Sequence, residues 1–246
     1  RHFVGHGGDF YFKDWHADRR LSTGLLLQKA AHDIDVLHWL CGSYTHRVNA
    51  MGALTVYGDV EDRRGEDEPW DASVHRDHWP PLTQTKLNPI VDVEDISMLQ
   101  MELHNGVLAS YQQCHFTPDY WRNYTVIGTE GRIENFGNGE DGTVIKLWNR
   151  RGSWDPDGHE TFPIIPETGS HGGADPKIVA EFIRFVREGG PIHTSPVAAR
   201  YSVATGCAAT ESLRNGGVPL EIPVLNRDVE AYFDNDSVGT HNGTRG

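Results

Sequence analysis

The spacing of apolar residues changes along the chain, and each change predicts a new element. We predict a strand over residues 2–6, and an irregular aromatic loop, 7–16, follows. Over residues 22–41 apolar positions recur at helical spacing, with a serine or threonine able to cap the start and a glycine directly after the end. Apolar and polar residues alternate over 47–57, which predicts a second strand.

The second half of the chain has a run of strands followed by two helices. The strands are predicted over residues 95–103, 107–116, 120–136, 143–150 and 161–165, with an Asn-Gly hairpin turn between the first two. The helices are predicted from Asp175-Pro176 to about Glu188 and from Ser195-Pro196 to about Asn215, and a short strand over 220–222 follows.

This order of elements predicts an α+β fold, with an open-faced, mostly antiparallel sheet and helices packed on one side. The elements do not alternate as in a doubly wound nucleotide-binding sheet. We predict one domain over residues 1–225 and a polar arm or disordered tail over 226–246. The domain contains a polar, proline-rich loop at 59–92, which is either a functional lid or a solvated insertion.

Composition narrows the class of protein. The 246 residues carry a formal net charge of -13, which argues against nucleic acid or an anionic membrane as a partner. The sequence has no apolar run near the ~20 residues that span a bilayer. Three widely spaced cysteines form no disulfide framework, so we expect a reducing, cytoplasmic setting. The chain begins without Met and directly on a strand, so we expect further residues upstream.

The predicted helix over 22–41 carries the best candidate chemistry. Lys29, His32 and Asp33 lie within little more than one helical turn, and Asp35 follows. A lysine, an imidazole and carboxylates on a rigid helix can do acid/base work on an alcohol or a carbonyl. The alternative is a solvated face in which Lys29 and Asp33 form an ordinary surface ion pair.

Two motifs are rejected on their context. Residues 137–142 satisfy the dinucleotide pattern G-x-G-x-x-G, but the strand-like segment 143–148 follows in place of a helix N-terminus, so we predict a hairpin turn. The 14 histidines suggest a metal site, but they do not cluster at ligand spacing, because His32 and His38 do not share a helix face. We therefore predict no metal.

Two further segments hold candidate ligand-binding residues. Aromatic and charged side chains between residues 114 and 122 suit a sugar-like ligand, because rings stack on sugars and carboxylates bind hydroxyls. A strand connection anchored by buried Tyr and Trp explains them equally well. His171, which precedes two glycines and a helix, is a possible pocket residue, although a plain helix cap at Asp175 is favoured.

The spaced combination of three motifs resembles a known family. The motifs are Gly24…Lys29-x-x-His32-Asp33-Ile34-Asp35-x-Leu37-x-Trp39-Leu40-x-Gly42, then Val126-Ile127-Gly128-Thr129-Glu130-Gly131-Arg132-Ile133-Glu134, then His171-Gly172-Gly173-Ala174-Asp175. Together they resemble the C-terminal domain of the Gfo/Idh/MocA oxidoreductases, which are relatives of glucose–fructose oxidoreductase and inositol dehydrogenase. The resemblance extends to about residue 223, apart from the loop at 59–92.

The resemblance implies a two-domain enzyme. An N-terminal Rossmann domain, absent here, would bind NAD or NADP and supply a catalytic lysine in a Glu-Lys-Pro motif. This C-terminal domain would supply the pocket for a sugar, polyol or similar hydroxy compound. Its open sheet face would form a homodimer or homotetramer. We expect the chain alone to bind no cofactor and to be inactive.

The resemblance also assigns roles. Many members carry Asp-x-x-x-His on this helix, with the His acting on the substrate hydroxyl; here the match is Gln28-x-x-x-His32, and Gln cannot take a proton. We therefore predict His32 and Lys29 as catalytic residues, with Asp33 or Asp35 orienting His32. The predicted substrate-binding residues are Asp33, Asp35, Gln28, Lys13, Trp15, His115, Asp119, Tyr120, Arg122 and His171, with Asp14 beside them.

Two other functions stay open. The parent protein could be an NAD-recycling glycosidase or lyase of the same family, in which the cofactor is regenerated in each turnover. The chain could also be a non-catalytic binding and dimerisation module.

Overall fold

The computed structural model describes residues 1–70, 78–139, 141–189, 192 and 194–231. The chain divides into two compact units. The first comprises residues 1–126 and 202–222, and the second comprises residues 127–201 and those from 223 onward. Each unit is described by itself.

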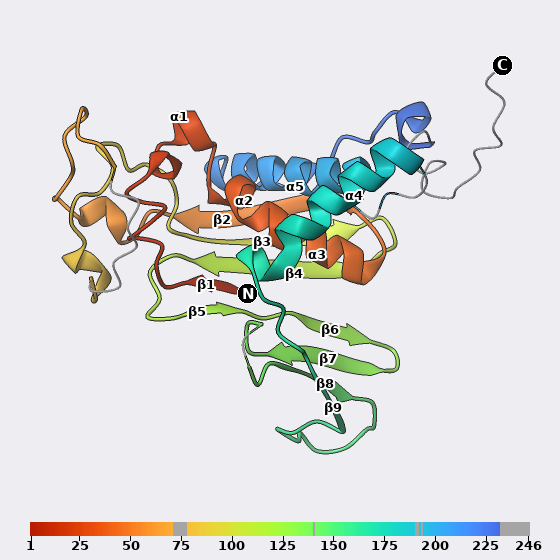
Figure 1. Ribbon diagram of the computed structural model, residues 1–246. Helices are drawn as coiled ribbons and strands as arrows, with labels where there is room; N and C mark the ends of the chain where they lie inside the picture. The colour runs from red at the N-terminus through yellow and green to blue at the C-terminus, as the bar shows by residue number, and fades with distance from the viewer. Residues whose placement is uncertain (71–77, 140, 190–191, 193, 232–246) are drawn as a thin grey trace. The chain divides into compact units, whose positions relative to one another are not determined.

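The first unit is built on a six-stranded sheet with the strand order β10–β2–β3–β4–β1–β5 (Figure 1). Its strands are β1 His2–Val4, β2 Thr45–Ala53, β3 Ile96–Leu103, β4 Leu108–Cys114, β5 Tyr120–Arg122 and β10 Leu220–Glu221. Neighbouring strands run antiparallel except β1 and β4, which are parallel. The predicted α+β fold with a mostly antiparallel sheet is confirmed.

The two faces of this sheet differ in burial. Along β3, Leu99, Met101 and Leu103 are buried, whereas Met98, directly before Leu99, is 47% exposed. Helices α3 (Ala30–Cys41) and α5 (Pro196–Arg214, of which residues 202–214 belong to this unit) cover the buried face (Figure 1). The backbone N–H of Ala50 on β2, for example, donates to the Ser212 hydroxyl of α5 at 3.0 Å. The predicted placement of helices on one side is confirmed.

The long helix predicted from residue 22 is wrong in its first half. The segment forms three pieces: α1 Arg19–Ser22, α2 Leu25–Gln28 and α3 Ala30–Cys41. Neither Ser22 nor Thr23 caps the long helix, because Ser22 ends α1 and Thr23 has a left-handed φ of 67°. A second break falls at Lys29, which joins α2 to α3. The predicted end at Gly42 is confirmed by its left-handed backbone.

Helix α5 packs closely against α2. Gly206 of α5 lies against the backbone of α2, and a Cβ at this position would come within 2.6 Å of the Leu26 carbonyl oxygen. Only glycine permits this approach.

A second core lies under the aromatic loop that follows β1. Phe12 stacks beside Tyr57 with ring centres 4.6 Å apart, and Leu87 and Val93 complete the buried cluster. Both ends of the segment 60–93 therefore pack in this core. In the described parts of the loop at 59–92, no regular element is longer than the 3-10 turn η3 (Pro81–Thr83). The prediction of an irregular loop is therefore confirmed there.

The second unit contains a four-stranded sheet in the order β6–β7–β8–β9 and the helix α4 (Ala174–Glu188). Its strands are β6 Thr125–Gly128, β7 Gly131–Phe136, β8 Val144–Trp148 and β9 Glu160–Pro163. The single strand predicted over 120–136 is therefore wrong. The chain turns at Thr129 and Glu130, and β7 begins at Gly131, where a Cβ would meet the Trp148 carbonyl oxygen at 2.4 Å.

Two other predictions are decided in this unit. The glycine motif at 137–142 leads into β8, so the rejection of a dinucleotide loop is confirmed. Asp175 does not cap α4: the helix begins at Ala174 and its N-cap is Gly173.

Residues 227–231 of the predicted tail form a helical turn, and residues 232–246 lie outside the described part. Among the described residues, no helix is both long and apolar enough to cross a membrane.

The close approach at Gly206 gives a stability prediction. In an exposed helix Gly→Ala stabilises by up to ~1 kcal/mol, but Gly206→Ala is expected to destabilise by about 1–3 kcal/mol because the new methyl group overlaps α2. Urea unfolding of the chain measures the difference. Cys207→Ala, at the next and exposed position of α5, is the matched control. A midpoint for Gly206→Ala at or above that of the control would contradict the packing.

Candidate active site

The buried carboxylate of Asp33 joins α3 to the sheet. Its side chain is 2% exposed and accepts hydrogen bonds from the hydroxyls of Tyr111 (2.9 Å) and Tyr124. The Nδ1 atom of His2 lies 3.1 Å from Oδ2, and the Nε atom of Arg122 lies 3.2 Å from Oδ1. These partners come from β1, β4, β5 and the residues after β5. The Asp33 side chain therefore contacts four residues from separate parts of the unit.

These contacts fix the charge of Asp33. Burial opposes ionisation, but the hydrogen bond from His2 and the positive charge of Arg122 outweigh it, and the pKa of Asp33 falls to about 2. Burial lowers the pKa of His2, which is therefore neutral at pH 7 and donates from Nδ1. Asp33 is thus a permanently charged anchor, unsuited to proton transfer at neutral pH.

A second cluster surrounds the buried ring of Tyr11. The Lys29 ammonium lies 5.2 Å from the ring centre, and the imidazoles of His16 and His115 meet the ring edge-on at 5.2 and 5.6 Å. His6 stacks on it at 6.5 Å. Burial, and then the charge of Arg122, lower the pKa of Lys29. The break between α2 and α3 places Lys29 in this cluster.

In the Tyr11 cluster, a carboxylate orients the imidazole of His16. Its Nδ1 lies 2.9 Å from Asp14 Oδ2, while Asp14 Oδ1 accepts the Trp15 backbone N–H at 2.6 Å and caps the 3-10 turn η1 (Trp15–Ala17). The Trp15 ring stacks on His16 at 3.9 Å. Sequence reasoning selected Asp14 and Trp15 and missed His16. The Asp-x-His spacing within an aromatic segment was the available signal.

Two buried imidazoles keep unsatisfied nitrogens. His115 is 0% exposed, and neither ring nitrogen has a hydrogen-bond partner among the described residues. The same holds for Nε2 of His2. Burial holds the pKa of His115 well below its usual range, so this ring is neutral. Such groups carry a desolvation cost and are uncommon away from functional sites or bound water.

His32 lies at the solvent-exposed edge of these clusters. Burial of part of the ring, and then the charges of Lys29 and Arg122, lower the pKa of His32. Burial raises the pKa of Asp35, whose charge acts on His32. The structure thus brings Lys29, His32 and Asp35 into one neighbourhood and turns Asp33 towards the sheet.

The other predicted residues are dispersed. The Gln28 amide donates to the Ser22 carbonyl at 3.1 Å, which secures the turn between α1 and α2. Lys13 lies 3.9 Å from Asp9, away from the Tyr11 contacts described above. Tyr120 stacks on His6 at 5.4 Å and meets His2 edge-on at 5.3 Å, so it joins the cluster.

Asp119 and His171 take no part in the contacts that define the two clusters. Asp119 is exposed, and its backbone lies against Gly5. His171 belongs to the second unit, where Nδ1 lies 2.9 Å from Asp175 on the exposed turn η4 (Ser170–Gly173). In the described part of the chain no group of three His, Cys, Asp or Glu residues could hold a metal ion.

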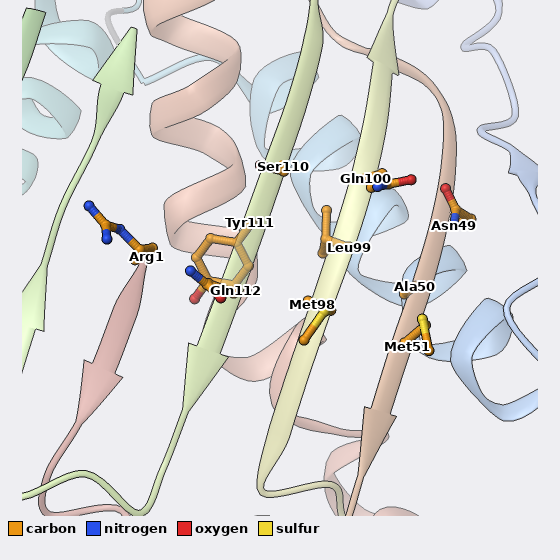
Figure 2. Close-up of a pocket in the computed structure, with 10 residues that line it drawn as sticks. All are labelled: Arg1, Asn49, Ala50, Met51, Met98, Leu99, Gln100, Ser110, Tyr111 and Gln112. Carbon is orange, nitrogen blue, oxygen red and sulfur yellow. The ribbon is translucent and has the colours of Figure 1, made fainter.

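A groove of about 290 Å³ lies on the opposite, open face of the first unit's sheet. Figure 2 shows its lining residues spread over β2, β3 and β4, with Arg1 at one side. Met51 and Met98 are direct cross-strand neighbours there, and the remaining exposed groups are mostly amides and a hydroxyl. Apart from the Tyr111 phenol, Arg1 is the ionisable residue in the lining of this groove, so the groove offers little for acid/base chemistry.

Comparison with known proteins assigns the family. A family model described as "Oxidoreductase family, C-terminal alpha/beta domain" (GFO_IDH_MocA_C) matches residues 3–222. The chain therefore belongs to the Gfo/Idh/MocA oxidoreductases as their C-terminal domain, and the resemblance inferred from the sequence motifs is confirmed. The chain is 25% identical over 212 residues to "Putative oxidoreductase YteT" of Bacillus subtilis (strain 168), covering 71% of this chain and 50% of that protein.

Solved structures show the same fold. Levoglucosan dehydrogenase in complex with NADH and levoglucosan aligns with a TM-score of 0.63 and 19% identity, over 91% of this chain and 58% of that one. Aldose-aldose oxidoreductase from Caulobacter crescentus aligns with a TM-score of 0.55 and 16% identity, over 89% and 52%. The chain thus spans about half the length of these relatives.

The charge of Asp33 gives a prediction for pH dependence. Because its pKa is lower in the folded state than in the unfolded chain, Asp33 contributes about 2 kcal/mol of stability above about pH 4. This contribution is lost as the pH falls towards 2. Asp33→Asn is expected to lower the free energy of unfolding by about 3 kcal/mol at pH 7, because Arg122 and His2 lose the carboxylate that they contact. It is also expected to make that free energy depend less on pH in the acid range.

Urea unfolding at pH 7 and pH 3 measures both effects. Asp35→Asn is the control, because it removes a carboxylate whose pKa burial raises, and it is expected to leave stability unchanged or slightly higher. Equal unfolding energies for the wild type and Asp33→Asn at pH 7 would mean that Asp33 does not anchor α3.

Proposed function

We propose that this chain is the substrate-binding and subunit-contact domain of an NAD(P)-dependent oxidoreductase that acts on a sugar, polyol or similar hydroxy compound. The observation that carries the proposal is the cluster of ionisable and aromatic groups around Lys29 and Tyr11, beside the helix-covered face of the sheet. Rings that stack on a sugar and groups that move a proton are close together there.

The cofactor site is assigned to a part of the enzyme outside this chain. The glycine motif at 137–142 leads into a strand, which does not fit a pyrophosphate. Levoglucosan dehydrogenase, whose structure holds NADH, is nearly twice as long as the segment that aligns here. A nicotinamide ring supplies hydride transfer. The residues of this chain bind and orient the substrate and move the proton, in a reducing, cytoplasmic setting.

His32 is the proposed acid/base. Its exposed position lets it reach a hydroxyl presented from outside the domain, and its lowered pKa keeps it unprotonated and ready to accept a proton at neutral pH. Lys29 polarises the same substrate oxygen. The charge of Asp33, and then that of Asp35, act on His32. Because Asp33 is held by the sheet, Asp35 is the carboxylate proposed to orient His32. Trp15 and Tyr120 offer rings for stacking.

A second function is favoured by one observation. The Asp14–His16 pair adds another oriented imidazole to the cluster. Elimination and hydrolysis need a second proton-transfer group, which a simple dehydrogenase does not. An NAD-recycling glycosidase or lyase would release the leaving group from an activated glycoside without net NADH, and product analysis of the intact protein separates the two functions.

Replacing His32 tests its proposed acid/base role in the dehydrogenase reaction. In the intact protein, His32→Ala is expected to lower turnover by about 10²–10⁴-fold while leaving the fold and the NAD affinity unchanged. Steady-state kinetics and cofactor titration measure these quantities. His46→Ala, at the start of β2 and beside His104, is the control. Turnover retained in His32→Ala would remove the proposed role.

The open sheet face gives a prediction for assembly. We propose that two copies meet through the face that carries Met51 and Met98, because exposed apolar side chains on a flat sheet are typical of subunit contacts. Met98→Glu is expected to shift the dimer to monomer in light scattering coupled to gel filtration. Val203→Glu, at an exposed position of α5, is the control and should leave the dimer intact. A dimer unaffected by Met98→Glu would place the contact elsewhere.

A further inference from the structure

The carboxylates beside the Tyr11 cluster are already engaged by cations or imidazoles. Asp33 is held by Arg122 and His2, Asp14 by His16 and the Trp15 backbone, and Asp9 by Lys13 and His78. All three acids are at least nine-tenths buried. Within the described residues, none of the three forms an ion pair with Lys29.

Lys29 is the cation left without such a partner. Within the described ranges, no carboxylate oxygen lies within 4.0 Å of its ammonium, and its one specific contact is the face of the Tyr11 ring. Its stem leaves the backbone at the break between α2 and α3, and the side chain is partly buried. A cation–π contact offsets only part of what a partly buried ammonium loses in hydration.

The neighbouring groups cannot supply a negative charge. Burial raises the pKa of Tyr11 to about 12, so its phenol is neutral at pH 7. Burial also lowers the pKa of His115 and that of His16, so these rings are neutral and supply no negative charge. The charges of Arg122 and Asp33 act on Lys29 in opposite directions, and Asp33 is itself held by Arg122. Among the described residues, Lys29 therefore has no anion of its own at ion-pair distance.

We propose that the substrate itself supplies the anion, and that the ligand is a sugar acid whose carboxylate binds the Lys29 ammonium beside the Tyr11 ring. This inference rests on the proposed function and narrows its substrate class from hydroxy compounds in general to uronates or aldonates. A carboxylate at Lys29 would form a charge-assisted hydrogen bond, and the sugar ring would extend towards Tyr120 and His32. Lys29 is then a specificity-determining residue as well as a polarising one.

Binding of matched acid and neutral sugars to the chain tests the proposal. The pairs are glucuronate and glucose, galacturonate and galactose, and gluconate and glucitol, which differ at one carbon. Calorimetry or NMR titration is expected to show at least one acid binding about 10–100-fold more tightly than its neutral partner, the range of one charge-assisted hydrogen bond. Acetate alone should bind far more weakly.

The variants separate charge from fold. Lys29→Met is expected to abolish the difference in affinity between each acid and its neutral partner, and Lys29→Arg to retain most of that difference. Lys177→Met, at an exposed lysine of the second unit, is the control and should change nothing. Circular dichroism confirms that each variant folds.

The outcomes distinguish this inference from the proposed function. Equal binding of acid and neutral sugars, or a preference that survives in Lys29→Met, overturns the inference and leaves the sugar site in place. Binding of none of the sugars overturns both.

Discussion

The buried carboxylate of Asp33 is the interaction on which the position of the site depends. A charge inside a protein is costly unless ion pairs and hydrogen bonds replace its hydration. Asp33 obtains them from Arg122, His2 and two tyrosines, and these residues come from separate strands. The bonds therefore fix the start of α3 against the sheet. Lys29 and His32, within four residues of Asp33, are positioned by the same contacts.

The break in the helix before α3 has a functional consequence. A continuous helix would keep Lys29 and His32 on one solvated face. Helix α5 packs closely against α2 at Gly206, and at the break between α2 and α3 the Lys29 ammonium lies over the Tyr11 ring. Imidazoles from the aromatic loop and from the end of β4 meet the same ring. The break therefore lies where the cluster forms.

The sheet of the first unit separates two kinds of surface. Its helix-covered side carries buried residues such as Leu99, Met101 and Tyr111, and its open side carries exposed methionines, amides and the ion pair between Arg47 and Glu102. Alternation along a strand produces this division, because successive side chains point to opposite faces. Substrate binding and subunit contact can therefore occupy the same strands. A substitution on one face need not disturb the other.

Local pattern determined the strands β2, β3, β4, β8 and β9, the helices α4 and α5, the α+β class and the family, because these follow from periodicity, turn residues and spaced motifs. Pattern also selected Lys29 and His32. It could not show that Asp33 anchors α3 to the sheet, that a carboxylate orients His16, or that the helix breaks at Lys29. Those outcomes depend on partners such as Arg122, Tyr111 and α5, which are distant in the chain. Only the tertiary structure, by deciding which charges share a buried space, could set them.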